Sequence, residues 1–218
     1  MTVSERQASP GVVAGWGGIS TLAVEHESED LERVTRHVPL TRGLGRSYGD
    51  SSLPPPGEPV VAASPRADRL LAFDDETGDL TAEAGYSLYD LWDTFLPRGW
   101  FTPVSPGTQF VTLGGMVAAD VHGKNHHREG SIGRHVQSLR IRVARGDIVT
   151  CSRQQEPDLF RATIGGMGLT GHILEVTLRL VRIPSPWIYG QTHRVSGIDE
   201  FIRVLHAARD EWPFTMGW

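Results

Sequence analysis

The chain carries, at residues 41–50, the sequence Thr41-Arg42-Gly43-Leu44-Gly45-Arg46-Ser47-Tyr48-Gly49-Asp50, directly after a predicted strand. Three glycines in this run allow consecutive backbone N–H groups to converge in a nest that binds phosphate. The guanidinium groups of Arg42 and Arg46 can add charge-assisted contacts. Ser47 can donate from its hydroxyl, and Tyr48 can pack its ring on a planar ligand. The loop therefore predicts a site for a phosphate-bearing ligand, with a tight surface turn as the alternative.

Two other motifs fit this loop less well. The third glycine comes only at position 49 and no helix clearly follows it, which departs from the dinucleotide-binding fingerprint of Rossmann domains. Gly45–Gly49 formally matches the serine hydrolase motif G-x-S-x-G, but a nucleophile elbow needs a helix after the serine. The sequence that follows, Asp50-Ser-Ser-Leu-Pro-Pro-Pro56, does not begin a helix well, so the pattern disfavours a hydrolase.

Two further glycine-rich segments lie at residues 106–119 and 164–173. In the first, Gly114 and Gly115 open a predicted helix of small residues, and free N–H groups at a helix start favour an anion. Simple helix packing is the alternative explanation for these glycines. The second links a predicted helix to a long predicted strand. Three such loops in one chain indicate a large, extended ligand that carries phosphate.

Lys124 is the only lysine among the 21 residues that are lysine or arginine. An ammonium is a compact charge whose pKa shifts on burial, so its place beside His122, His126 and His127 suggests a chemical site, with chance as the alternative. A zinc site is disfavoured, because the glutamate of H-E-x-x-H is missing and Gly123 and Asn125 interrupt a helix. We expect no metal.

Composition excludes several classes of protein. The 218 residues carry a net charge of −5, which gives no electrostatic case for nucleic acid. No apolar run is long enough to span a membrane. Cys151 is the single cysteine and cannot form an internal disulfide, which agrees with a cytoplasmic location. Peripheral association with a membrane remains open.

Hydrophobic periodicity predicts an α+β fold with partly antiparallel sheets rather than a doubly wound sheet. The first dozen residues look frayed. We expect helices that start near Ser28, at Ser87, at Leu113, at Pro157 and after Ser196, the first ending near Arg36 and the third at Val121. Strands are expected at 38–41, 60–63, 70–73, 79–84, 136–143, 147–152, 172–181 and 214–218.

Four segments together resemble the vanillyl-alcohol-oxidase (PCMH-type) family of FAD-binding domains, and within it the flavoproteins similar to decaprenylphosphoryl-β-D-ribose oxidases. The matching residues are Arg42–Asp50, Gly107-Thr108 with Val111-Thr112-x-Gly114-Gly115, Asp120-x-His-Gly-Lys-Asn-His-His127 with Gly130-Ser-x-Gly133, and Gly168–Gly171. The resemblance implies a bipartite FAD-binding domain of two α+β subdomains at residues 12–186, followed at 187–218 by only the beginning of a substrate-capping domain.

The resemblance also assigns the site. It implies that the pyrophosphate is cradled by Gly43, Gly45, Arg46, Ser47, Tyr48 and Gly49, with Arg42 and Leu44 in the same loop. It implies that the flavin side is lined by Gly107, Thr108, Val111, Thr112, Gly114, Gly115 and Ala119, together with Gly123 and Asn125. Gly171 and the backbone of Ile173 would hold the adenine half. His122 and Lys124 would lie beside the isoalloxazine and act in catalysis.

One departure from the family pattern concerns attachment of the cofactor. Many relatives carry a histidine in R-G-x-G-H-S and bind the flavin covalently, whereas this chain has Arg46 at that position, so the resemblance implies non-covalent FAD. The implied function is oxidation of a C–OH group of a sugar or alditol by hydride transfer to flavin N5. The alternative is a non-catalytic FAD-binding module, or a half-enzyme that needs a separately encoded cap domain or a reductase partner.

Overall fold

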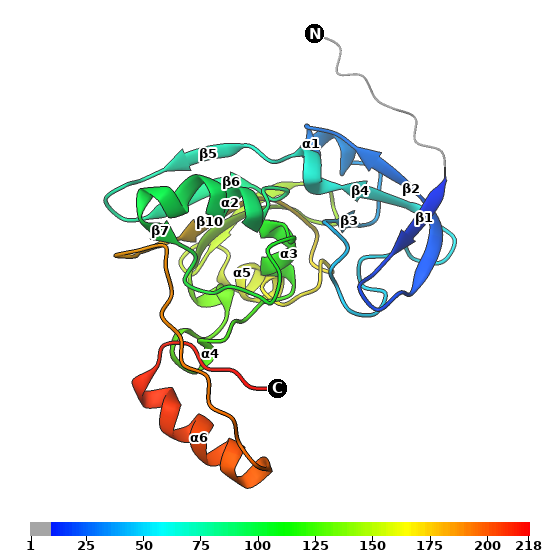
Figure 1. Ribbon diagram of the computed structural model, residues 1–218. Helices are drawn as coiled ribbons and strands as arrows, with labels where there is room; N and C mark the ends of the chain where they lie inside the picture. Colours follow the sequence, from blue (N-terminus) through cyan, green and yellow to red (C-terminus); the bar gives the residue numbers. More distant parts are fainter. Residues whose placement is uncertain (1–9) are drawn as a thin grey trace.

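Two main sheets form the body of the protein, and the structure, a computed structural model, describes residues 10–218 (Figure 1). The first sheet has four strands in the order β1-β2-β4-β3. Strand β2 is antiparallel to β1 and parallel to β4, which is parallel to β3. The strands are β1 Gly11–Ala14, β2 Ser20–Glu27, β3 Thr41–Arg42 and β4 Val60–Ala63.

The second sheet has five strands in the order β5-β6-β10-β8-β9, and all its neighbouring strands are antiparallel. They are β5 Leu70–Phe73, β6 Asp79–Glu83, β8 Val136–Arg142, β9 Ile148–Ser152 and β10 His172–Arg179. A short pair joins β7 Trp100–Phe101 to β11 Val181–Arg182. The chain is therefore a mixed α/β protein whose sheets are partly antiparallel, as the sequence predicts.

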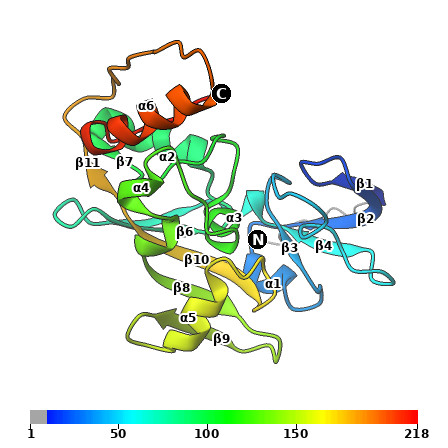
Figure 2. The ribbon, with the colours of Figure 1, turned by 90° about the horizontal axis from the view of Figure 1, so that it is seen from below.

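Six α-helices lie in the described part of the chain. They are α1 Leu31–Val34, α2 Leu88–Phe95, α3 Leu113–Ala118, α4 His126–Glu129, α5 Pro157–Thr163 and α6 Ile198–Glu211. Short 3₁₀ turns cover Ser64–Arg66, Leu96–Arg98 and Ile132–Arg134. Helix α3 lies centrally, between the two sheets (Figures 1 and 2), so its first turn is available to segments from both.

The main core lies between the five-stranded sheet and helices α2 and α3. Helix α2 is capped by Ser87, whose side chain accepts a hydrogen bond from the N–H of Asp90. Leu88, Leu91 and Phe95 recur at helical spacing on one face, and all three are fully buried. Burial of each such side chain contributes about 1.5–3 kcal/mol. This core fixes α2 and α3 against the sheet that carries β10.

Most predicted elements are present, and the differences have local causes. Strands β4 and β5 and helix α5 have the predicted bounds. Helix α3 ends at Ala118 rather than 121, because Asp120 turns the chain with a φ of 42°. Helix α1 ends at Val34 rather than near 36. The expectation that the first dozen residues are frayed is wrong where they form β1, because Gly11–Ala14 pairs with β2. Residues 1–9 lie outside the described part of the chain.

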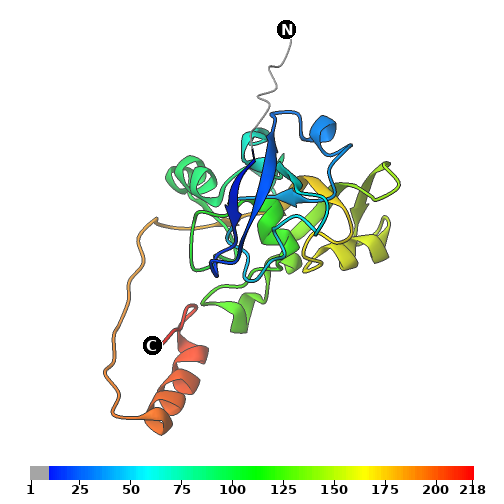
Figure 3. The ribbon, with the colours of Figure 1, turned by 90° about the vertical axis from the view of Figure 1, so that its right-hand side faces the viewer.

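The C-terminal segment stands apart from the sheets (Figures 1 and 3). An irregular stretch, residues 183–197, leads to α6. The far end of α6 returns to α4, where Arg128 donates to the carbonyl oxygen of Asp210 at 2.7 Å. The N–H of Thr215 donates to the Lys124 carbonyl oxygen at 3.0 Å. The strand predicted at 214–218 is wrong, because these residues form no ladder. Within residues 10–218, no helix combines the length and the apolar character needed to cross a bilayer.

Candidate functional site

One groove brings the three glycine-rich segments together. It is open to solvent and lies between the loop after β3, the start of α3 and the start of β10. Its lining residues are small or hydroxyl-bearing for the most part: Thr41, Gly43, Ser47, Ser51, Ser52, Ser64, Ala84, Thr112, Gly114, Gly115, Ala118, Ala119, Met167, Gly168, Gly171 and Ile173. Segments that are far apart in sequence thus share one surface.

The first loop meets α3 at very short range. A Cβ on Gly43 would lie 2.6 Å from Thr112 Oγ1, closer than real Cβ contacts allow, so only glycine fits there without a shift. Gly45 and Gly49 have φ angles of +67° and +66°, which favour glycine. The loop is also held from outside, since the N–H of Trp16 donates to the Ser47 carbonyl oxygen at 2.9 Å.

The two arginines of this loop play different parts. The Arg42 side chain is only 12% exposed and pairs with Glu25, with Nε 2.9 Å from Oε1. It also donates to the Ala14 carbonyl oxygen at 2.9 Å and to Ser52 Oγ at 3.3 Å. The guanidinium is therefore engaged in joining β1, β2 and the loop, and it does not line the groove. Arg46 is exposed and lies 5.7 Å from the centroid of the Trp16 ring.

The start of α3 is built around Thr112. This residue is the N-cap, is 2% exposed, and accepts a hydrogen bond from the N–H of Gly115 at 3.2 Å. The helix lies very close to the turn that follows β6, because a Cβ on Gly114 would sit 2.8 Å from the Ala84 Cβ. Gly114 therefore lets α3 approach Ala84, and both residues line the groove.

The third segment closes the other side of the groove. A Cβ on Gly171 would lie 2.1 Å from the Arg142 carbonyl oxygen, and its φ is +139°, so glycine is required. Met167 also has a left-handed backbone, with a φ of 51°, which is strained for a residue with a side chain. Its N–H donates to the Ala118 carbonyl oxygen at 2.8 Å, and this bond fastens the loop to the end of α3.

The lysine–histidine segment lies beyond the groove lining. His122 and Lys124 are exposed, whereas Asn125 is buried. Asn125 Nδ2 donates to the Pro103 carbonyl oxygen at 2.7 Å, while its Oδ1 has no partner. A Cβ on Gly123 would lie 2.6 Å from the Ser105 carbonyl oxygen. Gly123 and Asn125 therefore fasten this segment to residues 103–105, and the two exposed side chains project from it.

The histidines do not form a metal site in the part of the chain that the structure describes, where no group of three or more metal-ligating side chains converges. The rings of His122 and His126 lie with centroids 5.8 Å apart. They come from different elements, because α3 ends at Ala118 and α4 begins at His126. The helical spacing noted in the sequence therefore does not describe their arrangement.

The predicted cofactor residues fall into two sets, those that line the groove and those that do not. Those that line it are Gly43, Ser47, Thr112, Gly114, Gly115, Ala119, Gly171 and Ile173. Those that do not are Arg42, Leu44, Gly45, Arg46, Tyr48, Gly49, Gly107, Thr108, Val111, His122, Gly123 and Asn125. Among the second set, Tyr48 is 78% exposed at the tip of the first loop.

Several lining residues were not among the predicted site residues. Ser51 and Ser52 directly follow the first loop, and Gly168 lies in the third glycine-rich run, so their neighbourhood in sequence was a usable signal. Met167 precedes Gly168 in the same run, whereas Ser64 carries no such signal, since only the packing of the fold brings it to the groove.

Residues 31–152 match a family of FAD binding domains, which is more than half of the 218-residue chain. The chain belongs to this FAD-binding family of oxidoreductases. It is 34% identical to the decaprenylphosphoryl-beta-D-ribose oxidase of Mycolicibacterium smegmatis, over 99% of this chain and 49% of that protein. It is 32% identical to a putative D-arabinono-1,4-lactone oxidase of Neurospora crassa, over 76% of this chain and 31% of that protein.

A third relative is the L-gulonolactone oxidase of Mus musculus, 30% identical over 53% of this chain and 26% of that protein. The chain thus spans about half or less of the length of these curated relatives. The family and its FAD cofactor are shown by these matches, whereas the activity of any one relative belongs to that relative.

The residues present fit FAD, the cofactor of this FAD-binding family. Added side-chain atoms at Gly43, Gly114 and Gly171 would meet neighbouring groups at 2.1–2.8 Å, so glycine keeps the backbone close-packed along the groove. Ser47 and Ser51 line the same space, and serine hydroxyls can donate to phosphate or ribose oxygens. An extended ligand with polar atoms along its length suits such a surface.

Proposed function

We propose that this chain supplies the cofactor site of an FAD-dependent oxidoreductase that oxidises a C–OH group of a sugar or polyol. The observation that carries the proposal is the single groove lined by all three glycine-rich segments. When bound, FAD supplies a flavin that accepts hydride at N5. The sugar-lactone oxidases among the relatives support a small, hydroxyl-rich substrate.

Binding of the cofactor is assigned to residues along the groove. The backbone of the loop at 43–49, with Ser47 and the exposed charge of Arg46, would hold the pyrophosphate. Gly115 and Thr112 at the start of α3 would border the flavin half. The backbone of Ile173 would hold the adenine half. Hydrophobic packing of α2 and α3 keeps these groups in place before the ligand arrives, which lowers the cost of binding.

Catalysis is assigned to the exposed pair His122 and Lys124. The ammonium of Lys124 would stabilise negative charge that develops near flavin N1 or a substrate oxygen. His122 would position the substrate hydroxyl, or take its proton as a general base. The contacts of Gly123 with Ser105, and of Asn125 with Pro103, would hold the two side chains in a fixed orientation.

The domain limits and the attachment of FAD are also proposals. The two sheets support a bipartite FAD-binding domain at 12–186. The separate position of α6 (Figure 3) supports residues 187–218 as the beginning of a substrate-capping domain. Arg46 in place of histidine supports non-covalent FAD. The single cysteine supports a cytoplasmic location.

Acid precipitation of the purified protein tests the cofactor proposal. An absorption spectrum should show flavin bands in the protein, and after precipitation these bands should appear in the supernatant. Colour that stays in the pellet would mean covalent attachment and would contradict the role given to Arg46. Protein that binds no flavin, even after incubation with FAD, would overturn the proposed site.

A second candidate function is an FAD-binding module that depends on a separately encoded cap or a reductase partner. Trp187 and Ile188, which are 87% and 78% exposed, favour a covering partner for the C-terminal segment. Anaerobic addition of sugar alcohols or sugar-lactone precursors discriminates the two. Bleaching of the flavin by the chain alone supports the enzyme, whereas bound flavin that never bleaches supports the module.

A further inference from the structure

We propose that two cross-strand pairs on strands β8 and β10, Arg142 with His172 and Arg140 with Glu175, are positioning residues that set the spacing of the FAD groove. The inference rests on the proposed function, because it assumes that FAD lies in that groove. His172 lies at the end of the third glycine-rich segment, but Arg140, Arg142 and Glu175 belong to no sequence motif, and none of the four residues lines the groove.

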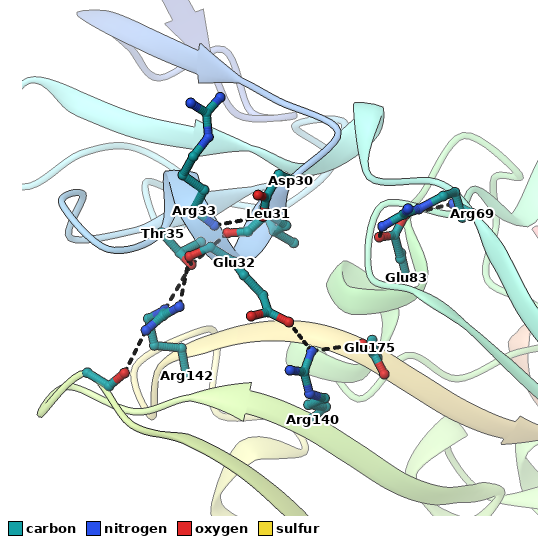
Figure 4. A network of polar contacts seen from close by, with 11 residues as sticks. Asp30, Leu31, Glu32, Arg33, Thr35, Arg69, Glu83, Arg140, Arg142 and Glu175 are labelled. Atoms are coloured by element: carbon teal, nitrogen blue, oxygen red, sulfur yellow. Dashed lines mark hydrogen bonds and ion pairs between the residues drawn. The ribbon is translucent and has the colours of Figure 1, made fainter. Parts of the chain in front are cut away.

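The two pairs are neighbours in one ladder. Arg142 is the register partner of His172, and Arg140 is the register partner of Glu175. The Arg140 and Arg142 side chains leave the five-stranded sheet and point toward α1, which precedes β3 of the four-stranded sheet in the chain (Figure 4). The contacts between these side chains and α1 therefore join segments that belong to different sheets.

Arg142 makes two hydrogen bonds to the end of α1. Its Nη2 donates to the Glu32 carbonyl oxygen at 2.8 Å, and its Nε donates to Thr35 Oγ1 at 3.1 Å. A third bond, from Nη1 to the Gly146 carbonyl oxygen at 2.6 Å, anchors the guanidinium at its own sheet. Arg142 is 7% exposed and Thr35 is 2% exposed. Because a buried donor without a partner is costly, this contact strongly favours one position of α1.

Arg140 supports the same position from a more exposed site. Its Nη1 contacts the carboxylate of Glu32 on α1, and also Glu175 Oε1 at 2.9 Å. The Arg140 side chain is 31% exposed, so solvent screens these ion pairs and each contributes less than the buried contact. Glu32 thus contacts both arginines: its carbonyl oxygen accepts from Arg142, and its carboxylate pairs with Arg140.

His172 carries the connection to the groove itself. Its Nδ1 lies 2.7 Å from Thr41 Oγ1. Thr41 is the first residue of β3, which leads directly into the first glycine-rich loop, and Ile173 follows His172 on β10. Thr41 and Ile173 both line the groove. A shift of β3 relative to β10 would therefore change the distance between the two surfaces that FAD would touch.

This arrangement matters for binding because affinity depends on how well a site is formed beforehand. A ligand that spans both surfaces binds best when they are already at the correct separation. Loss of the contacts that Arg140, Arg142 and His172 make would leave the folded protein with a range of distances between these two surfaces. The expected signature is weaker FAD binding by protein that is still folded, which a contribution to stability alone would not produce.

Thr35→Val is the sharpest test, since it removes the hydroxyl that Arg142 binds without changing a residue that lines the groove. FAD titration of the apoprotein, followed by flavin fluorescence well below the unfolding temperature, should give a Kd about tenfold higher, which corresponds to ~1.4 kcal/mol. Thr35→Ser keeps the hydroxyl and should restore the Kd. Arg140→Gln, at a more exposed position, should weaken FAD binding to a smaller extent. It replaces Thr35→Val as the test if that variant does not fold.

Arg179→Gln is the matched control. Arg179 also belongs to β10 and makes a two-bond ion pair with its register partner Asp79, but that pair stays within the five-stranded sheet. Its removal should leave the Kd unchanged. Wild-type affinity in folded Thr35→Val or Arg140→Gln would overturn the inference while the proposed function stands. Wild-type protein that binds no FAD would overturn the proposed function, and the inference with it.

Discussion

Thr112 and Gly43 meet at the point where the first glycine loop touches α3. The Thr112 hydroxyl caps the helix by accepting from the N–H of Gly115, and a Cβ at position 43 would lie 2.6 Å from it. The two residues come from different glycine-rich segments, so their contact fixes how close the two walls of the groove can be.

Gly43→Ala should therefore disturb both the loop and the helix cap. Overpacking of this kind typically costs about 1–3 kcal/mol, and we expect that loss in the free energy of unfolding measured with urea, together with weaker FAD binding. Gly17→Ala is the control, because a Cβ there meets nothing within 4 Å. In a double-mutant cycle, Thr112→Ala should remove most of the added cost; a fully additive result would mean that the contact does not cause it.

Substitution of Arg42 should lower the stability of the apoprotein, whereas substitution of Arg46 should weaken FAD binding. Arg42→Met breaks its contacts with Glu25, Ala14 and Ser52, and a hydrogen bond to a charged group is worth about 1.5–3 kcal/mol, so we expect the apoprotein to lose roughly that much stability. Arg46→Gln should change apoprotein stability by less than about 0.5 kcal/mol but weaken FAD binding at low salt. The reverse result would assign the pyrophosphate contact to Arg42.

Lys124→Met should make the bound flavin harder to reduce. A nearby ammonium stabilises the negative charge gained on reduction, so its loss should lower the two-electron reduction potential by about 30 mV, equivalent to ~1.4 kcal/mol. Equilibration with a reference dye under anaerobic conditions measures this potential. Lys124→Arg retains the charge and should stay near the wild-type value, and an unchanged potential in Lys124→Met would place Lys124 away from the flavin.

His172 should make the protein less stable in mild acid. Burial, with the nearby Arg142 charge, holds its pKa below the ordinary 6.5, although the Val38 backbone raises the pKa in part. The unfolded chain therefore takes up the proton first, so stability present above about pH 6.5 is lost as the pH falls. Urea midpoints at pH 7.5 and 5.5 should differ less in His172→Asn than in the wild type. The same change at the exposed His206 should not reduce the difference.

Cys151 should be unreactive in the folded protein. It is fully buried, and burial, followed by the charge of Glu156, raises its pKa to about 11. Because the thiolate is the reactive species, an aromatic disulfide reagent at pH 8 should label the protein only after urea is added. The stability that the neutral thiol contributes is present below pH 9 and lost as the pH rises toward 11. Rapid labelling without urea would contradict the buried position.

Local chemistry explains why part of the fold was predictable. The apolar spacing of Leu88, Leu91 and Phe95 indicates a helix, and Ser87 with Asp90 marks its start. Strand β1 was missed, since Gly11–Ala14 is a short strand whose pairing with β2 is a tertiary event. Likewise, the sequence predicts a phosphate contact for Arg42 because its neighbours form a predicted phosphate-binding loop, yet Glu25, distant in the chain, engages its guanidinium.

The sequence by itself determined the family, the FAD cofactor and the three glycine-rich segments, because glycine at fixed positions is a local requirement of backbone shape. Tertiary structure alone decided that these segments share one groove, that Ser64 and Ala84 border it, and that Arg142 contacts α1 while His172 contacts β3. The physical reason is that such contacts depend on how two sheets pack, and no local pattern of residues records the distance between them.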